Sequence, residues 1–254
     1  MEAGEDVLAV LEKVAEAISV VLEGLSDWGL AGTDKPSQYF SDLAADEVAL
    51  EILAEAGYGV LSEESGLHDR HREILVVLDP VDGSTNAARG IPWFATSLCA
   101  LDAAGPLAAL VVNQATGTSH SAIRRAGAFR DGQPIRAAST TAAGEAVVGV
   151  SGYPPRHLGW RQFRALGSAA LDLCAVADGT LDAYVDCSSD AHGPWDYLGG
   201  LLVCREAGAA VGDASGRDLV TRGHGERRTP CAAASEELLT QLLAARNAAC
   251  AKSD

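Results

Sequence analysis

Apolar positions follow a helical period near the start of the chain. Between Val7 and Leu25 they recur every three or four residues, which predicts an amphipathic helix. The segment from Gly24 to Ser41 has no period and holds glycine and proline, so we expect a loop or hairpin there. A second helical pattern, from Asp42 to Ala56, stops at Gly57, as a glycine C-cap would.

Short apolar runs follow this second helix. Gly59–Leu61 and Ile74–Leu78 predict buried strands, and we expect the second to stop at Asp79-Pro80. Turn residues separate three further predicted strands, which are Ala95–Leu101, Leu107–Val112 and Thr118–Ile123.

After residue 145, predicted strands and helices alternate. The strands are Ala146–Ser151 and Leu181–Val185, and the helices are Ser168–Ala177, Asp196–Ala207 and Ser235–Ala245. This order predicts an α+β half at residues 1–145 and an α/β half at residues 146–254.

Composition narrows the class of protein. The chain has 254 residues, 48% of them hydrophobic, which is enough for a sizeable core. Its formal net charge is -16 and no basic stripe offsets it, so we expect neither nucleic acid nor a membrane as a partner. No apolar run approaches the ~20 residues of a membrane span, and the acidic N-terminus lacks the basic start of a secretory signal. We therefore expect a cytoplasmic protein. Six cysteines without a Cys-x-x-Cys pair predict small buried residues.

Three acidic clusters stand out because each lies at the end of an apolar segment. Glu63 follows the first predicted strand, Asp79 and Asp82 follow the second, and Asp196 opens a predicted helix. Carboxylates at such places point toward the crevice in which α/β proteins bind ligands.

The stretch Asp79-Pro80-Val81-Asp82-Gly83-Ser84-Thr85-Asn86 combines a metal site with a phosphate site. The strand delivers Asp79 to the sheet edge, and Asp82 returns to the same side, so two carboxylates converge. Mg²⁺ prefers oxygen ligands and is commonly held by a few carboxylates together with a substrate phosphate. Gly83-Ser84-Thr85 then offers backbone N–H groups at a helix start, where anions bind.

Each cluster also has a purely structural explanation. Asp-Pro-x-Asp-Gly is a common turn, Glu63-Glu64 alone would be a solvated acidic pair, and Asp196 would be the N-cap of its helix. The combination favours function, because burying three carboxylate groups without a cation is unfavourable.

The order of these motifs resembles the inositol monophosphatase family of lithium-sensitive, Mg²⁺-dependent phosphatases. The resemblance covers nearly the whole chain and rests first on Ser62-Glu63-Glu64, on Asp79 to Asn86 and on Trp195-Asp196 with Gly199-Gly200. Further landmarks are Gly127-Ala128-Phe129, Gly132-Gln133-Pro134-Ile135, Gly167-Ser168-Ala169-Ala170, Asp182-Ala183-Tyr184 and Glu206-Ala207-Gly208. The resemblance implies a layered αβαβα sandwich of the sugar-phosphatase type, two or three Mg²⁺ ions, a small phosphorylated substrate and a homodimer.

The resemblance also implies roles for single residues. The metal ligands are Glu63, Asp79, Asp82, Asp196 and the carbonyl of Val81. The catalytic residues are Glu63, Asp46, which would position a third metal or the attacking water, and Ser84, which stands where the family usually has threonine. Gly83, Ser84 and Thr85 would hold the phosphate, while Gly167, Ser168, Ala169, Asp186 and Asp196 would contact the rest of the substrate. Lys35 matches a lysine of a mobile loop in the family.

Departures from the family pattern lie mainly at the substrate wall. Ala87 replaces an aromatic residue, Leu198 replaces a small one, and residues 187–194 form a short insertion. His192 in this insertion is a candidate substrate contact, and the segment before Asp46 lacks the usual Asp-Leu-Val-Thr. An inositol monophosphate-like substrate is expected, with fructose 1,6-bisphosphate, histidinol phosphate and a nucleotide 3′-phosphate left open.

The expected reaction is hydrolysis of a phosphate monoester by a metal-activated water. Asp82-Gly83-Ser84 also resembles the nucleophile loop of haloacid-dehalogenase phosphatases, but in those enzymes one residue separates the two aspartates, whereas here two do. A P-loop kinase is disfavoured because no Gly-x-x-x-x-Gly-Lys-Ser/Thr occurs. A metal-binding regulatory protein without turnover is the non-enzyme alternative, and the four carboxylates together with Ser84 argue against it.

Overall fold

The structure is a computed structural model that describes residues 2–25 and 39–250. Lys35 and most of the segment between Gly24 and Ser41 lie outside the described residues. The remaining predicted elements can all be compared with the structure.

Two helices cover the first sheet from outside. Helix α1 (Glu2–Glu23) buries the predicted apolar stripe, including Leu11 and Ile18, and α2 (Phe40–Glu55) packs beside it. The α2 helix ends as predicted: Gly57 has φ +77°, and the next amide, that of Tyr58, donates to the Leu53 carbonyl at 3.0 Å.

The first sheet has eight strands in the order β2-β1-β3-β4-β5-β6-β7-β8. Their bounds are β1 Gly59–Ser62, β2 Gly66–His68, β3 Leu75–Asp82, β4 Ala95–Asp102, β5 Gly105–Asn113, β6 Ser119–Ile123, β7 Gly127–Arg130 and β8 Gln133–Pro134. Strands β1 and β3 pair in parallel, and every other neighbouring pair is antiparallel.

The prediction that the second strand stops at Asp79-Pro80 was wrong, because β3 continues to Asp82. Pro80 cannot donate to the ladder, and the pairing with β4 shifts register between Asp79 and Asp82. The Pro80 carbonyl still accepts a 2.8 Å hydrogen bond from the Thr96 hydroxyl. This irregularity brings two carboxylates to the end of one strand, followed by the short helix α3 (Ser84–Arg89).

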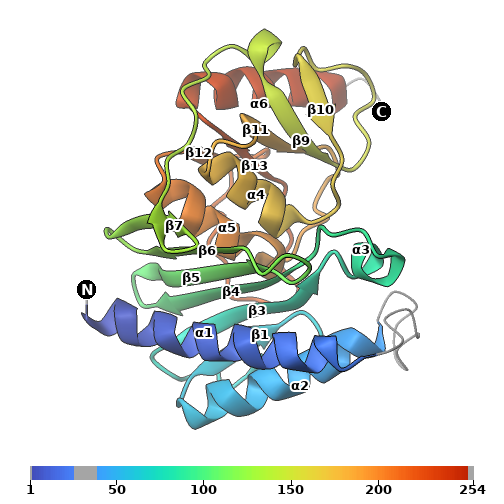
Figure 1. The fold of residues 1–254 in the computed structure, drawn as a ribbon. Coiled ribbons are helices and arrows are strands. Elements are labelled where there is room, and N and C mark those ends of the chain that lie inside the picture. Colours follow the sequence, from blue (N-terminus) through green and yellow to red (C-terminus); the bar gives the residue numbers. More distant parts are fainter. Residues whose placement is uncertain (1, 26–38, 251–254) are drawn as a thin grey trace.

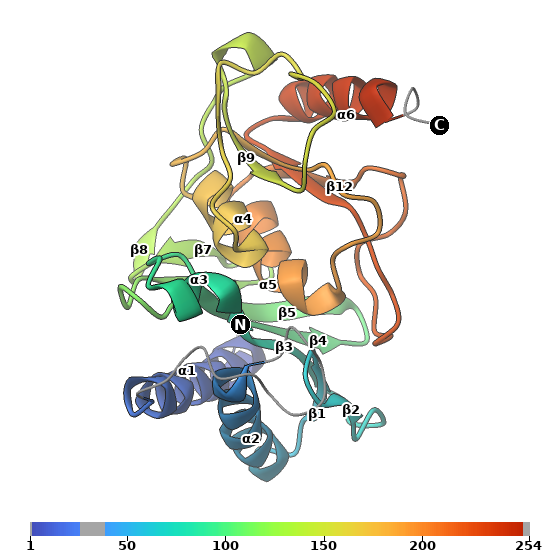
Figure 2. The ribbon, with the colours of Figure 1, turned by 90° about the vertical axis from the view of Figure 1, so that its right-hand side faces the viewer.

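The second sheet has five strands in the order β10-β9-β11-β13-β12. Their bounds are β9 Val147–Ser151, β10 Gln162–Arg164, β11 Ala183–Asp186, β12 Ala210–Asp213 and β13 Pro230–Ala233; the turn η1 (Ala143–Glu145) precedes them. Helices α4 (Ala169–Ala177) and α5 (Pro194–Glu206) lie between the two sheets, and α6 (Glu236–Cys250) covers the outside of the second. Figures 1 and 2 show the five resulting layers, so the predicted αβαβα sandwich is confirmed.

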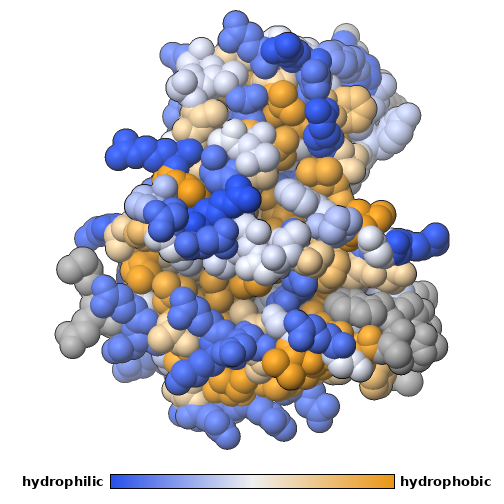
Figure 3. All heavy atoms as spheres, in the orientation of Figure 1, coloured by the Kyte–Doolittle hydropathy of each residue, from blue (hydrophilic) through white to orange (hydrophobic). Residues whose placement is uncertain are grey.

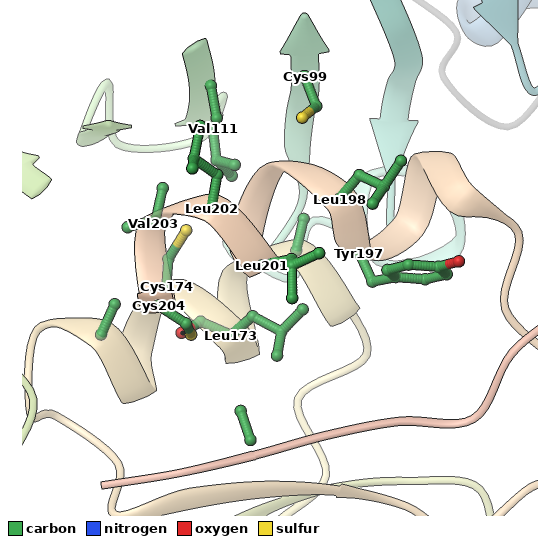
Figure 4. Packing of buried hydrophobic residues seen from close by; sticks show 14 of the residues in the cluster. Cys99, Val111, Leu173, Cys174, Tyr197, Leu198, Leu201, Leu202, Val203 and Cys204 are labelled. Carbon is green, nitrogen blue, oxygen red and sulfur yellow. Dashed lines mark hydrogen bonds between the residues drawn. The ribbon is translucent and has the colours of Figure 1, made fainter. Parts of the chain in front are cut away.

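The layer of α4 and α5 holds the largest core cluster. In Figure 4, Leu198 and Leu202 point from α5 toward the strands that carry Cys99 and Val111, while Leu201 lies on the opposite side, near α4. Because α5 is buried on both sides, its first turn, which contains Asp196, is held firmly against the end of the first sheet.

Five of the six cysteines are buried, as predicted: Cys99, Cys174, Cys187, Cys204 and Cys231. Figure 3 shows hydrophilic residues on the upper and lower parts of one face, with apolar residues between them. The division of the chain near residue 145 stays a prediction.

Candidate metal and phosphate site

Three of the predicted carboxylates meet in space. One oxygen from each of Glu63, Asp79 and Asp196 lies within 4.8 Å of the others, although these residues come from the end of β1, from β3 and from α5. The parallel pairing of β1 with β3 explains the first two positions. Ser62 lies opposite Leu78, and the next amide, that of Glu63, donates to the Leu78 carbonyl at 3.1 Å.

The charges in this cluster repel one another and are poorly solvated. Burial, followed by the charge of Asp196, raises the pKa of Glu63 to about 8. Burial and then the charge of Glu63 raise the pKa of Asp79 well above its usual value, and Asp79 is only 1% exposed. A bound cation would remove both penalties, and carboxylate oxygens are ligands that suit Mg²⁺, so this donor set fits the predicted metal.

Asp82 is not one of the three converging residues. Its Oδ2 accepts hydrogen bonds from the Ser168 hydroxyl at 2.6 Å and from the Ala170 amide at 2.7 Å. Burial and the charge of Asp196 nevertheless raise the pKa of Asp82 to about 7, because they outweigh these hydrogen bonds. Asp82 therefore lies beside the cluster, with one carboxylate oxygen committed to the start of α4.

Two further predicted residues brace the cluster. The buried Asp46 on α2 accepts a short hydrogen bond from the Ser62 hydroxyl, whose oxygen accepts the Glu64 amide at 3.1 Å. Val81 donates its amide to Asp79 Oδ1 at 3.0 Å. Asp46 thus holds the turn that carries Glu63, and a metal-binding role for the Val81 carbonyl stays a prediction.

Asp196 is not the N-cap of its helix. It is the third residue of α5, whose N-cap is Gly193, and its Oδ2 accepts the Gly193 amide at 2.7 Å. This contact is the half of a capping box that an acidic third residue provides. The carboxylate is therefore oriented by the backbone of the helix start.

The predicted phosphate-binding turn lies directly after Asp82. Gly83 caps α3 at φ +88°, and a Cβ there would lie 3.0 Å from the Gly167 carbonyl oxygen and 3.1 Å from that of Trp93. Ser84 is half-buried and Thr85 exposed, and helical bonding leaves first-turn amides without partners within the helix. Asn86 fixes the turn, because its Nδ2 donates to the carbonyls of Trp93 and Leu166 at 2.7 Å each.

The residues predicted to contact the rest of the substrate differ in exposure. Gly167 is exposed, but Ser168 and Ala169 are buried, and the Ser168 hydroxyl is used by Asp82. Asp186 is 0% exposed, and contact of these residues with a substrate stays a prediction. Ser168 and Ala169 are buried because the chain turns inward at Gly167 to begin α4.

His192 contacts Asp196, a relationship that the sequence alone does not predict. Its Nδ1 lies 3.2 Å from Asp196 Oδ2, and its Nε2 lies 3.2 Å from the Tyr184 hydroxyl and 3.6 Å from Asp186 Oδ2. Burial alone would lower the pKa of His192, but the hydrogen bond and charge of Asp196, followed by the charge of Asp186, raise it to about 9. Because a loop has no periodic pattern, the only signal for this contact in the sequence is that His192 stands four residues before Asp196.

A comparison with known proteins identifies the family of the chain. A model of the inositol monophosphatase family matches residues 5–250. The chain belongs to this family of phosphatases. The matched residues include Glu63, Asp79 and Asp196 and nearly all of the five-layer fold.

Relatives and solved structures extend over most of the chain. A fructose-1,6-bisphosphatase of Pyrococcus furiosus is 33% identical over 207 residues, covering 80% of both chains. An inositol-1-monophosphatase of Rhizobium meliloti is 37% identical over 207 residues, covering 71% of this chain and 74% of its own. The structure of an inositol monophosphatase from Anabaena (Nostoc) superposes with a TM-score of 0.79 at 25% identity and covers 96% of each chain.

Within residues 2–25 and 39–250, no helix combines the length and apolar character that crossing a bilayer requires. The cytoplasmic location and the homodimer stay predictions.

Proposed function

We propose that the chain hydrolyses the phosphate monoester of a small polyol or sugar with the help of Mg²⁺. The observation that carries the proposal is the convergence of Glu63, Asp79 and Asp196 beside the glycine turn at Gly83. A strongly acidic chain would repel a phosphate unless cations at this cluster reversed the local field.

The residues of this chain have separate tasks in the proposed reaction. Bound Mg²⁺ would neutralise phosphate charge and lower the pKa of a water molecule. Glu63, Asp79 and Asp196 would hold the ions, and Asp82, which bonds to Ser168 and Ala170 through Oδ2, would add a further ligand through Oδ1. The amides of Gly83, Ser84 and Thr85 would receive the phosphate, and the Ser84 hydroxyl would orient the attacking water.

The names of the relatives support two substrates in particular. One group is named inositol-1-monophosphatase and another fructose-1,6-bisphosphatase, and some relatives carry both names. We propose an inositol monophosphate-like substrate, with fructose 1,6-bisphosphate as the second candidate. In both compounds the phosphate ester is attached to a hydroxyl-rich group.

Phosphate release tests the proposal directly. The chain is assayed with inositol 1-phosphate, fructose 1,6-bisphosphate, histidinol phosphate and a nucleotide 3′-phosphate, with Mg²⁺, with chelator, and with lithium added to Mg²⁺. We expect activity that disappears in chelator and returns with Mg²⁺, and a loss of more than 100-fold in Glu63→Gln and Asp79→Asn.

Glu51→Gln is the matched control, because Glu51 is an exposed carboxylate on α2. It should retain the parent activity. Activity that survives chelation would refute the metal-dependent mechanism, whereas Mg²⁺ binding without phosphate release from any compound would favour a regulatory protein.

A further inference from the structure

The segment 187–194, which precedes Asp196, is firmly anchored at its start. Arg246 of α6 is only 6% exposed, and its guanidinium donates to the Asp186 carbonyl and to the Ser188 carbonyl, each at 2.8 Å. A buried arginine whose donors are used by two backbone carbonyls fixes the path of the chain at that point. The segment therefore leaves β11 in one direction.

The middle and end of the segment are anchored as well. Asp190 accepts from Arg217 Nη2 at 2.6 Å and donates its amide to the Thr229 hydroxyl at 3.0 Å. The backbone of His192 exchanges hydrogen bonds with that of Arg228, at 3.3 and 2.9 Å. An irregular segment that makes this many specific contacts is a built support for the side chain it carries.

The side chain so placed is the His192 imidazole, which lies between two carboxylates. Asp196 is on its Nδ1 side, while Asp186 and the Tyr184 hydroxyl are on its Nε2 side. An ionised carboxylate only accepts hydrogen bonds, so the proton must reside on Nδ1 in the contact with Asp196. On the other side of the ring, Nε2 lies within hydrogen-bond distance of the Tyr184 and Ser151 hydroxyls, at 3.2 and 3.3 Å.

The contact with His192 occupies one oxygen of the Asp196 carboxylate. Asp196 Oδ2 accepts from both the Gly193 amide at 2.7 Å and His192 Nδ1 at 3.2 Å. These two donors leave Oδ1 as the oxygen available to a cation shared with Glu63 and Asp79. These hydrogen bonds thus fix the orientation of the Asp196 carboxylate, as the partners of metal ligands commonly do.

We propose that His192 is a positioning residue that holds Asp196 for metal binding, and that segment 187–194 is its scaffold. This inference rests on the proposed function, in which Asp196 is a metal ligand. His192 itself touches neither the metal nor the substrate. It acts by preorganising one carboxylate of the cluster.

Metal affinity of the purified chain tests this inference without any assay of turnover. Isothermal titration of the chelator-stripped protein with Mn²⁺ and with Mg²⁺ compares the parent with His192→Phe, which fills the ring space without a donor. We expect the affinity to fall 10- to 100-fold, the range typical for the loss of such a partner. His192→Asn places an amide donor near the Nδ1 position, so we expect affinity within about threefold of the parent.

A second variant covers the case in which His192→Phe does not fold. His192→Gln keeps a polar group on the Asp186 side but lacks the donor at the Nδ1 position, so it should also bind metal at least tenfold more weakly. The exposed His71 supplies the control, and His71→Ala should match the parent. Parent-like affinity in His192→Phe or His192→Gln would overturn the inference.

The proposed function and the proposed role of His192 can be refuted separately. If the parent binds neither ion, the proposed function fails and the inference fails with it. If the parent binds metal and Glu63→Gln weakens binding, but the His192 variants do not, only the inference fails. The ¹⁵N signals of His192 in the metal-free parent give an independent check, because a ring without a proton on Nδ1 would contradict the assigned contact.

Discussion

The hydroxyl of Ser168 donates a 2.6 Å hydrogen bond to Asp82, although 86 positions separate these residues in the chain. The same hydroxyl oxygen accepts the Leu171 amide at 3.3 Å and so caps α4. Ser168 therefore couples the start of a helix between the two sheets to a carboxylate beside the acidic cluster of Glu63, Asp79 and Asp196. The same hydrogen bond connects the two halves of the chain at the proposed active site.

Replacing Ser168 by alanine should affect both stability and activity. The lost cap costs about 1 kcal/mol, and the lost hydrogen bond to a charged group costs roughly a further 1.5–3 kcal/mol. Ser235→Ala is the matched control, because Ser235 accepts the Leu238 amide at 3.2 Å at the start of α6, on the outer layer. Denaturant unfolding and phosphate release should show a loss in both properties for Ser168→Ala and a loss of stability alone for Ser235→Ala. Equal activity in the two variants would contradict the role given to Ser168.

Alanine substitutions at Gly83 and at Gly90 distinguish the effect of backbone strain from the effect of close packing. Gly83 and Gly90 have φ of +88° and +70°, so alanine at either position is strained by about 1–2 kcal/mol. A Cβ at Gly83 would also press on two carbonyl oxygens at 3.0 and 3.1 Å, whereas a Cβ at Gly90 would meet nothing within 4 Å. Gly83→Ala should therefore lose about 1–3 kcal/mol more than Gly90→Ala and most of the activity. Kinetics that are the same for both variants would show that the turn at Gly83 does not hold the phosphate.

Periodicity predicted the elements that have strong apolar patterns, and the motifs predicted the fold. The stripe of α1 and the β-branched run of β3 are examples, since each has a single way to bury its apolar side chains. Strands β12 (Ala210–Asp213) and β13 (Pro230–Ala233) were missed because each has only four residues and carries at most one β-branched side chain. They form strands because β13 pairs with β11 and β12 pairs with β13, so tertiary pairing supplies what local propensity does not.

The candidate site was predictable as a set of residues but not as a set of contacts. Motifs named Glu63, Asp79 and Asp196, and the three do converge. Sequence alone does not show which oxygen of Asp82 bonds to Ser168, or that Asp186 is closed off. Those facts depend on the path of loops, which no period constrains.

The buried Asp172, which is not part of the acidic cluster, should also make the free energy of unfolding depend on pH. Burial raises its pKa to about 8, despite a 2.9 Å hydrogen bond from Trp93 Nε1. A carboxyl whose folded pKa is raised contributes stability that is complete below its unfolded pKa, near 4, and is lost as pH rises through 8. Asp172→Asn keeps an acceptor for Trp93 and cannot ionise. In chelator, its stability relative to the parent should therefore grow by up to about 1.4 kcal/mol per pH unit between pH 4 and 8. A constant difference in denaturant unfolding across this range would mean that Asp172 is not buried as described.

Removing the metal should reveal the repulsion within the acidic cluster. The pKa values of Glu63 and Asp82 are raised to about 8 and about 7, and that of Asp79 is raised as well, so each group favours the folded state most at low pH. In chelator, the free energy of unfolding should therefore fall as pH rises from about 4 through 8, and Glu63→Gln should flatten this decline.

Adding Mg²⁺ should reverse the decline, because metal and protons compete for the same oxygens. At 100 times its Kd, one ion stabilises the fold by about 2.7 kcal/mol. At a fixed Mg²⁺ concentration the gain in Tm should be larger at pH 8 than at pH 5.5, since fewer ligands are protonated at the higher pH. A gain that is equal at both pH values, or larger at pH 5.5, would show that the ion binds away from Glu63, Asp79 and Asp196.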